Sequence, residues 1–167
     1  MRSNVTADSL EVAARSLGVE LSAGIRDALL GVYGELDAWP DALPSLQALG
    51  DAGLRLALLS NMTPSMLNAG IEHAGLRGVF ERVLSTDDAR SFKPAPRAYA
   101  LGPSALRLPA ESILFVASAG WDAAGAKWFG YPTYWVNRPG APQEELGVAP
   151  DGTGRDLREL VDFASRR

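Results

Sequence analysis

The chain has 167 residues, 47% of them hydrophobic and 22% charged, with a formal net charge of −4. Such a composition is that of a globular domain able to bury a core. The absence of cysteine excludes a disulfide framework, a thiolate metal site and a cysteine nucleophile, and it favours a reducing cytoplasm. Because the chain has no basic block, no apolar run long enough to span a membrane and no signal peptide within Met1–Leu10, we expect a cytoplasmic protein that binds neither nucleic acid nor membrane.

The first segment, residues 1–41, is predicted to be helical. Apolar residues recur at helical spacing in Val5–Leu17, with Thr6 or Asp8 as the N-cap, and again in a second helix that begins at Ser22. The second helix is expected to carry one apolar stripe, formed by Ile25, Leu29, Val32, Tyr33 and Leu36.

From residue 42 onward, short apolar runs alternate with helical patterns. The predicted strands are Leu54–Ser60, Arg82–Thr86, Ile113–Ser118 and Thr133–Asn137. The predicted helices are Leu43–Asp51, Pro64–Ala74, Pro96–Leu101, Asp122–Phe129 and Asp156–Ser165, with a Pro/Gly-rich loop at Arg138–Gly154. This alternation predicts an α/β fold with a parallel sheet, whose ligands bind beyond the carboxyl ends of the strands.

Ser60 and Asn61 stand where the first predicted strand hands over to a helix. Free backbone N–H groups and the helix dipole favour an anion there, so a carboxylate or phosphate could bind. Simple capping of the helix by Asn61 or Thr63 explains the same residues equally well. The pattern leaves both interpretations open.

Lys93 and Asp122 follow the second and third predicted strands. Lys93 lies between an aromatic residue and prolines, and its positive charge could keep a nearby carboxylate ionised, although a solvated lysine in a turn is the simpler interpretation. Asp122 could orient a water molecule, pair with Lys93 or be the first-turn acid of a helix. Trp121 could line a pocket or pack in the core. The single histidine, His73, falls near a helix end and favours a surface role.

Three segments, taken in order, resemble a known family far more specifically than any one of them. LLSNMTPSML, SFKPAPRAYALG and ILFVASAGWDAAGAKWFGYPTYWVNRPG resemble the second, third and fourth motifs of the haloacid dehalogenase superfamily, and within it the (S)-2-haloacid dehalogenases. The resemblance implies a Rossmann-like parallel sheet in residues 42–167, lacking its first, nucleophile-bearing strand. Residues 1–41 are then a remnant of the helical cap.

The resemblance also implies a mechanism. An aspartate attacks the carbon that bears the halogen, and water hydrolyses the resulting ester with inversion. No metal and no cofactor are needed, and the substrate is a small 2-halocarboxylate. Lys93, Asp122 and Ser60 are the implied catalytic residues, with Lys93 keeping the nucleophile ionised and Asp122 organising hydrolysis. The implied substrate-binding residues are Asn61, Tyr99, Trp121 and Ser118.

The sequence departs from the family in the catalytic residues. No aspartate follows an early apolar strand, so the nucleophile is missing, together with the arginine that the family uses to bind halide. Asp151-Gly152-Thr153 is a near match to the nucleophile motif, but it lies in the predicted late loop and we interpret it as a decoy. Ala117 and Ala119 replace a serine and an asparagine of the fourth motif, and alanine cannot form their hydrogen bonds.

A further departure concerns the sheet. Without the nucleophile strand, the strands at 54–60 and 113–118 are left unpaired or forced together, so we expect a stable monomer only if the sheet closes up or another chain supplies the strand. A homodimer is possible. The leading hypothesis is a truncated dehalogenase, inactive alone. The alternatives are a hydrolase of another substrate such as a phosphatase, a non-catalytic anion-binding remnant, and a receiver-like signalling domain.

Overall fold

The structure is a computed structural model that describes residues 2–166. Met1 and Arg167, which begin and end the predicted segments 1–41 and 42–167, lie outside the described residues. The elements in chain order are α1 (Arg2–Ser16), α2 (Ala23–Gly31), η1 (Val32–Gly34), α3 (Ala42–Asp51), β1 (Ala57–Ser60), α4 (Pro64–His73), β2 (Arg82–Ser85), α5 (Pro96–Tyr99), α6 (Leu101–Leu106), η2 (Ala110–Ser112), β3 (Phe115–Ala117), α7 (Gly120–Phe129), β4 (Thr133–Val136), β5 (Gly152–Gly154) and α8 (Leu157–Ala164). None of these helices is long and apolar enough to cross a membrane.

All paired strands run parallel, as predicted, but they form two sheets. β1 pairs with β2, and β3, β4 and β5 pair in that order. Within residues 2–166, β1 and β3 share no ladder, so the sheet has not closed up. Of the two expected outcomes for a sheet without its nucleophile strand, the structure shows the unpaired one.

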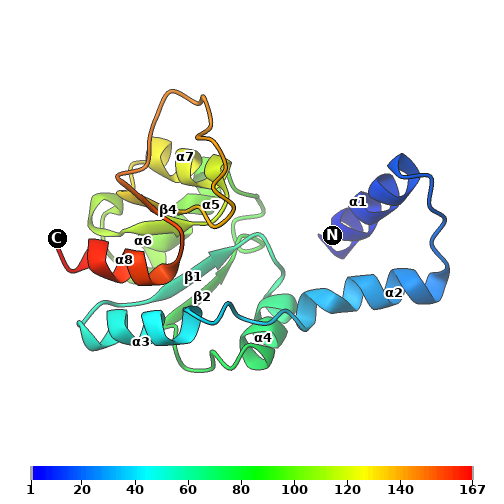
Figure 1. Ribbon diagram of the computed structural model, residues 1–167, viewed down its shortest axis with the longest axis horizontal. Coiled ribbons are helices and arrows are strands. Elements are labelled where there is room, and N and C mark those ends of the chain that lie inside the picture. The colour runs from blue at the N-terminus through cyan, green and yellow to red at the C-terminus, as the bar shows by residue number, and fades with distance from the viewer. Residues whose placement is uncertain (1, 167) are drawn as a thin grey trace.

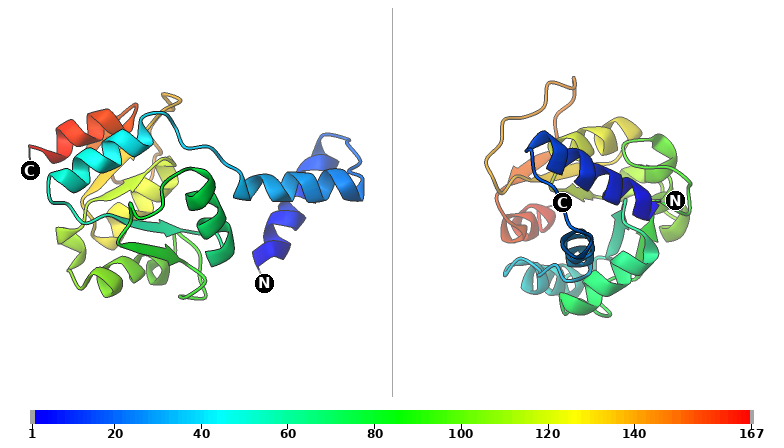
Figure 2. Two further views of the ribbon diagram at one scale, coloured as in Figure 1. Left: turned by 90° about the horizontal axis from the view of Figure 1, so that it is seen from below. Right: turned by 90° about the vertical axis from the view of Figure 1, so that its right-hand side faces the viewer.

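Helices cover the three-stranded sheet on both faces, because β4 alternates its side chains between them. Tyr134 and Val136 pack with Leu49 of α3 and Leu160 of α8. Trp135, on the opposite face, belongs to a cluster with the side chains of α5, α7 and β3, which comprises Tyr99, Phe115, Ala117, Ala123, Ala126, Tyr131 and Trp135. The result is a layered α/β body, seen in Figures 1 and 2.

The first two helices form an arm that projects from this body (Figures 1 and 2). Ser22 caps α2 by accepting a hydrogen bond from the backbone N–H of Ile25, as its predicted position requires. The proposed caps Thr6 and Asp8 are wrong, because α1 already begins at Arg2. The predicted apolar stripe exists but is not buried, since its members Ile25, Leu29, Val32, Tyr33 and Leu36 are all exposed.

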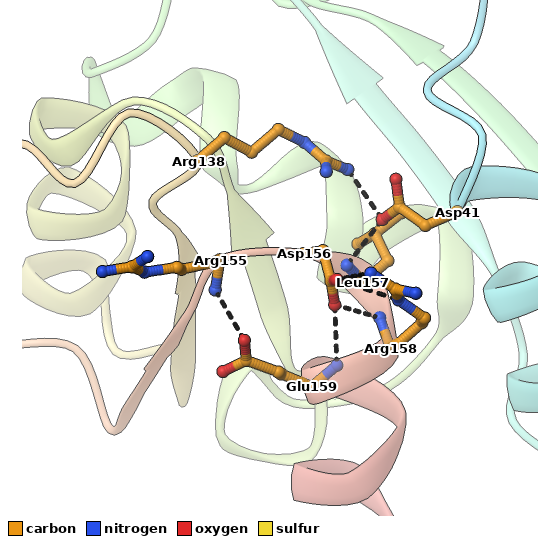
Figure 3. Close-up of polar contacts among 7 residues, drawn as sticks. All are labelled: Asp41, Arg138, Arg155, Asp156, Leu157, Arg158 and Glu159. Carbon is orange, nitrogen blue, oxygen red and sulfur yellow. Dashed lines mark hydrogen bonds and ion pairs between the residues drawn. The ribbon is translucent and has the colours of Figure 1, made fainter.

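One carboxylate joins the linker after the arm to the body. Asp41 Oδ2 accepts hydrogen bonds of 2.8 Å from Arg138 Nη2 and from the backbone N–H of Leu157, the first residue of α8 (Figure 3). The Arg138 guanidinium also lies 4.6 Å from the ring centre of Trp39. The Arg138 hydrogen bond holds the pKa of Asp41 below its ordinary value. The linker is therefore anchored at the end of β4 and at the start of α8.

The sequence interpretation missed one strand, one α-helix and the short 3-10 helix η2. Gly152–Gly154 lies at the end of the predicted Pro/Gly-rich loop, yet it forms β5 beside β4, although glycine is generally depleted in strands. Glycine is required there, since a Cβ on Gly154 would overlap the Tyr134 hydroxyl and one on Gly152 would lie 2.6 Å from the Phe163 ring. The predicted helix Pro96–Leu101 is two helices, α5 and the unpredicted α6.

Candidate active site

Lys93 and Asp122 form a buried ion pair beyond the carboxyl ends of the strands. Lys93 Nζ lies 2.5 Å from Asp122 Oδ2, and each side chain is only 10% exposed. The ammonium group also lies 5.4 Å from the ring centre of Phe115. Pairing with Lys93 is thus the alternative that the structure confirms for Asp122, which is also the first-turn acid of α7. The interpretation of Lys93 as a solvated turn residue is wrong.

Tyr99 completes this cluster. Its hydroxyl donates a 2.7 Å hydrogen bond to Asp122 Oδ1, so each oxygen of that carboxylate has a donor. Burial, followed by the neighbouring Asp122 carboxylate, raises the pKa of Tyr99 far above its ordinary value, and the phenol stays protonated. Tyr131 in turn donates a 2.6 Å hydrogen bond to the Tyr99 carbonyl. Lys93, Asp122 and Tyr99 therefore form one hydrogen-bonded group.

Asn61 positions the backbone of Lys93. Its Oδ1 accepts hydrogen bonds from the Lys93 N–H at 2.8 Å and from the Thr86 hydroxyl at 3.1 Å. Its Nδ2 donates to the Lys93 carbonyl at 3.4 Å. The Asn61 side chain thus joins the backbone of Lys93 to the end of β1. A direct contact between Asn61 and a substrate stays a prediction.

The capping interpretation is confirmed for Thr63 and not for Asn61. Thr63 Oγ1 accepts a hydrogen bond from the Met66 N–H and caps α4. Ser60 Oγ accepts from the Met62 N–H at 3.1 Å, which fixes the turn between β1 and α4. The serine is half-buried at the strand end, as expected. Its proposed role toward a substrate is not tested by these contacts.

Two residues that the sequence interpretation did not select help to shape this edge. Ser85 and Thr86 are both buried at the end of β2. Ser85 Oγ donates to the Met62 carbonyl at 2.7 Å, and the Thr86 N–H donates to the Ser60 carbonyl at 2.9 Å. Their only signal in the sequence was a pair of hydroxyls at a strand end, opposite Ser60.

The other proposed site residues lie around the buried pair. Trp121 lines an apolar cavity of about 340 Å³ together with Pro94, Tyr99 and Trp128, so it faces a pocket and is not part of the core. Ser118 is exposed, and its carbonyl accepts a 3.1 Å hydrogen bond from Trp135 Nε1. The backbone at Ser118 is thereby fixed at the carboxyl end of β3, and a contact of its hydroxyl with a substrate stays a prediction.

His73 and Asp151 lie outside this site. His73 ends α4 and contacts Asp37 at 3.1 Å on the surface, as predicted. Asp151 directly precedes β5, so it stands at the amino edge of the sheet, where it binds Lys127 and the Thr133 N–H. It lies within the predicted loop, and its position before β5 supports the decoy interpretation. No three His, Asp or Glu side chains within residues 2–166 are grouped to hold a metal ion.

The parallel α/β body and the lysine–aspartate pair at its strand ends define a class of protein. The chain belongs to the haloacid dehalogenase-like hydrolases, whose family model matches residues 4–130.

Within that family, the chain is similar to the 2-haloacid dehalogenases. It is 43% identical over 158 residues to the (S)-2-haloacid dehalogenase of Pseudomonas sp. (strain YL). The matched region covers 95% of this chain and 68% of that protein. It is 40% identical to haloacetate dehalogenase H-2 of Moraxella sp. (strain B), with 89% and 66% covered. The chain therefore spans about two thirds of the length of these relatives.

Solved structures agree with this assignment. The crystal structure of the L-2-haloacid dehalogenase RSc1362 superposes with a TM-score of 0.95 at 45% identity, covering 98% of this chain and 72% of that one. An L-2-haloacid dehalogenase from Xanthobacter autotrophicus with chloropropionic acid covalently bound superposes with a TM-score of 0.88 at 33% identity, covering 98% and 75%.

Proposed function

We propose that the chain carries part of a 2-haloacid dehalogenase site and is inactive alone, because the attacking aspartate is missing. In the complete reaction an aspartate oxygen forms a bond to C2 of a short 2-haloalkanoic acid as the carbon–halogen bond breaks and halide leaves. Water then adds to the carbonyl carbon of the ester, releasing a 2-hydroxy acid and restoring the aspartate. The cluster of Lys93, Asp122 and Tyr99 is the observation that carries this proposal.

Each site residue has a proposed role consistent with its contacts. Lys93 provides a buried positive charge that favours an ionised nucleophile. Asp122 organises the hydrolytic step, and Tyr99 keeps both groups in place. Ser60 and Ser118 face the substrate from the two strand ends.

Asn61 and Trp121 complete the proposed substrate site. Asn61 acts through the Lys93 backbone that it holds, and it adds to the polar surface facing the substrate carboxylate. Trp121 provides an apolar wall on the side of the leaving halide. The cytoplasm is the proposed location, which the absence of cysteine favours.

Halide release from (S)-2-chloropropionate tests this function. We expect the purified chain to release no halide above the rate of a Lys93→Ala variant. Turnover by the unaltered chain that disappears in Lys93→Ala would show that the chain is competent alone and would overturn the proposed inactivity. A Lys127→Ala variant is the matched control, because Lys127 pairs with Asp151 at the opposite edge of the sheet.

A second candidate function is the binding of a small carboxylate without turnover. The ligand would bind at the Ser60/Asn61 end of β1, and Ala117 and Ala119, which cannot form the hydrogen bonds of the residues that they replace, favour binding over turnover. Calorimetry with lactate tests this candidate. A dissociation constant below about 1 mM that rises in Ser60→Ala supports it, and no heat at millimolar lactate counts against it.

A homodimer is the proposed assembly. The apolar stripe on α2 and η1, which includes Ile25 and Leu29, is exposed in a single chain, and burying it against a second copy would remove that surface from water. Sedimentation equilibrium tests the assembly. A Leu29→Glu variant should be monomeric at concentrations at which the unaltered chain is dimeric. An unaltered chain that stays monomeric at about 100 μM counts against the proposal.

A further inference from the structure

An apolar cavity runs along α7, beside the Lys93–Asp122 pair. Its volume of about 340 Å³ lies within the range of small-molecule sites and well above the roughly 150 Å³ that admits benzene. Neither Lys93 nor Asp122 lines it, so the cavity is a separate space from the ion pair. We call it the tryptophan cavity, and its larger lining side chains are Pro94, Tyr99, Trp121, Trp128, Phe129 and Leu146.

The order of large and small residues on α7 creates the tryptophan cavity. Trp121, Ala124, Gly125 and Trp128 recur at helical spacing and therefore share one face of α7. The two large rings on this face are separated by residues that carry no side chain larger than a methyl group. Gly125 also allows a close approach to α7, since a Cβ at this position would lie 2.6 Å from the Tyr99 hydroxyl.

The tryptophan cavity offers a ligand no charge and few polar groups. Its lining contains no ionised side chain. The Tyr99 hydroxyl already donates to Asp122 Oδ1 at 2.7 Å, and Trp128 Nε1 donates to the Leu146 carbonyl at 3.1 Å. In the part of the chain that the structure describes, Trp121 Nε1 is the lining side-chain donor without a protein acceptor. A charged ligand would lose hydration here without gaining a counter-charge, so the lining selects a neutral ligand.

One wall of the tryptophan cavity belongs to a segment that packs lightly on the body. Residues 139–147, which we call the strap, follow β4 and are exposed at every position (Figure 1). The Asn137 side chain holds one end by exchanging hydrogen bonds of 2.8 and 2.9 Å with the Ala141 backbone. Trp128 holds the other end through the Leu146 carbonyl. The strap is therefore free to move aside for a ligand without exposing a buried residue.

We propose that the tryptophan cavity binds one small neutral aromatic molecule that carries a hydrogen-bond acceptor. Four of the lining residues are aromatic, and ring-to-ring packing favours an aromatic ligand over an aliphatic one of the same size. Trp121 and Trp128 are 41% and 68% exposed, so a ring bound between them removes apolar surface of both from water. The free N–H of Trp121 is the donor for the acceptor of the ligand.

This site goes beyond the proposed function. A 2-haloacid carries a carboxylate, which the uncharged lining does not accommodate and which the proposed function places at the end of β1. The tryptophan cavity instead contacts the neighbours of the ion pair, since Pro94 directly follows Lys93 and Trp121 directly precedes Asp122. Binding of a neutral aromatic molecule therefore depends neither on halide release nor on lactate binding.

Proton–nitrogen correlation spectra of the full chain test the site. Benzyl alcohol is the probe, because it joins one aromatic ring to a neutral hydroxyl. Benzoate is the matched charged ligand, with the same ring and a carboxylate. The side-chain N–H signals of Trp39, Trp121 and Trp128 are followed during each titration, and they are identified by substituting each tryptophan in turn.

We expect benzyl alcohol to shift the signals of Trp121 and Trp128 and to leave that of Trp39 unchanged. The dissociation constant should be about 1 mM, as is usual for a ligand of so few atoms. Benzoate should bind at least about tenfold more weakly, because its charge finds no partner in the lining. Addition of (S)-2-chloropropionate should not displace benzyl alcohol.

Two variants test the location. Trp128→Ala should weaken the binding of benzyl alcohol at least tenfold, and Trp39→Ala is the matched control, because Trp39 is 63% exposed against 68% and does not line the cavity. Ala124→Leu should weaken binding as strongly by filling the space between the rings. Its control is Ala48→Leu on the exposed face of α3.

Three results would overturn the aromatic site: equal affinity for benzoate, an equal loss of affinity in Trp39→Ala and Trp128→Ala, and displacement of benzyl alcohol by (S)-2-chloropropionate. The last would make the cavity part of the substrate site. Halide release is followed in the same samples. Binding of benzyl alcohol that persists whatever the outcome of that assay supports the aromatic site, so its failure and that of the proposed function are distinguishable.

Discussion

Lys93 Nζ lies 2.5 Å from Asp122 Oδ2, and the two side chains are largely hidden from solvent. Removing one partner of such a pair leaves an uncompensated buried charge, whereas an exposed pair contributes little.

Lys93→Met should lower the free energy of unfolding by about 3–5 kcal/mol, because the Asp122 carboxylate keeps its burial and loses its cation. Urea denaturation at pH 7 measures this loss. Lys127→Met is the matched control, since the Lys127–Asp151 pair is more exposed, and its cost should be below about 1 kcal/mol. Equal costs for the two variants would show that Asp122 does not need its lysine.

Tyr99→Phe should cost about 1.5–3 kcal/mol, since the lost hydroxyl donates to a charged carboxylate. Tyr131→Phe removes a hydrogen bond to a neutral carbonyl and should cost nearer 1 kcal/mol. Thermal unfolding of the two variants provides the comparison. A larger loss of stability in Tyr131→Phe than in Tyr99→Phe would show that the hydrogen bond of Tyr131 contributes more than that of Tyr99.

Stability should fall as pH rises above 10. Burial raises the pKa of Tyr131 from 10.0 to about 12, so between these values the unfolded chain loses a proton that the folded chain keeps. The contribution is complete below pH 10 and is lost as pH approaches 12. Tyr131→Phe should therefore make the stability curve flatter across this window. The free energy of unfolding of both proteins is measured in urea at pH 9, 10 and 11. If it falls with pH as steeply in Tyr131→Phe as in the unaltered chain, the pH dependence does not come from Tyr131.

Asp41→Asn should destabilise the chain by about 1–3 kcal/mol, because it weakens hydrogen bonds to a guanidinium and to a helix N-terminus (Figure 3). The pKa of Asp41 is lowered, so its contribution is present above pH 4 and is lost as pH falls through that lowered value. Arg138→Met should cost a similar amount, and the double variant should cost less than the sum. Strict additivity at pH 7 would show that the two residues are not coupled.

Ala119→Asn should raise the free energy of unfolding by about 1 kcal/mol. Ala119 has the extended backbone of an N-cap, with φ −92° and ψ 133°, but no side chain that can accept a hydrogen bond. Ser22→Ala is the converse control, since Ser22 does cap α2, and it should lose about as much. A loss of stability in Ala119→Asn would indicate that the asparagine does not reach the free N–H groups of α7.

Local pattern was enough to predict the parallel strands and the residues at their ends. The alternation of short apolar runs and helical stretches placed β1, β2, β3 and β4, and the order of those strands brought Lys93 close to Asp122. The pairing itself depends on which loops fold back over which strand. The sequence pattern could therefore suggest the contact between Lys93 and Asp122, but it could not distinguish that contact from the other roles considered for Asp122.

The parts that pattern could not predict depend on tertiary contacts. β5 consists of two glycines around Thr153, which disfavour a strand locally but are required beneath Tyr134. Asn61 belongs to a motif that predicts an anion site, and only the folded backbone shows that its amide holds Lys93. The apolar stripe of the arm was visible in the sequence, but its exposure was not, because periodicity does not specify a partner.

The direction of β5 determines what the Asp-Gly-Thr tripeptide at 151–153 can do in this fold. Asp151 lies where the strands of the sheet begin, and Lys93 lies where they end, so the full length of a strand separates them. Movement of the neighbouring loop does not change that polarity. The Asp-Gly-Thr tripeptide at 151–153 therefore cannot bring its carboxylate to Lys93 while β5 keeps its parallel pairing with β4, and Asp151 remains a partner of Lys127 and the Thr133 N–H.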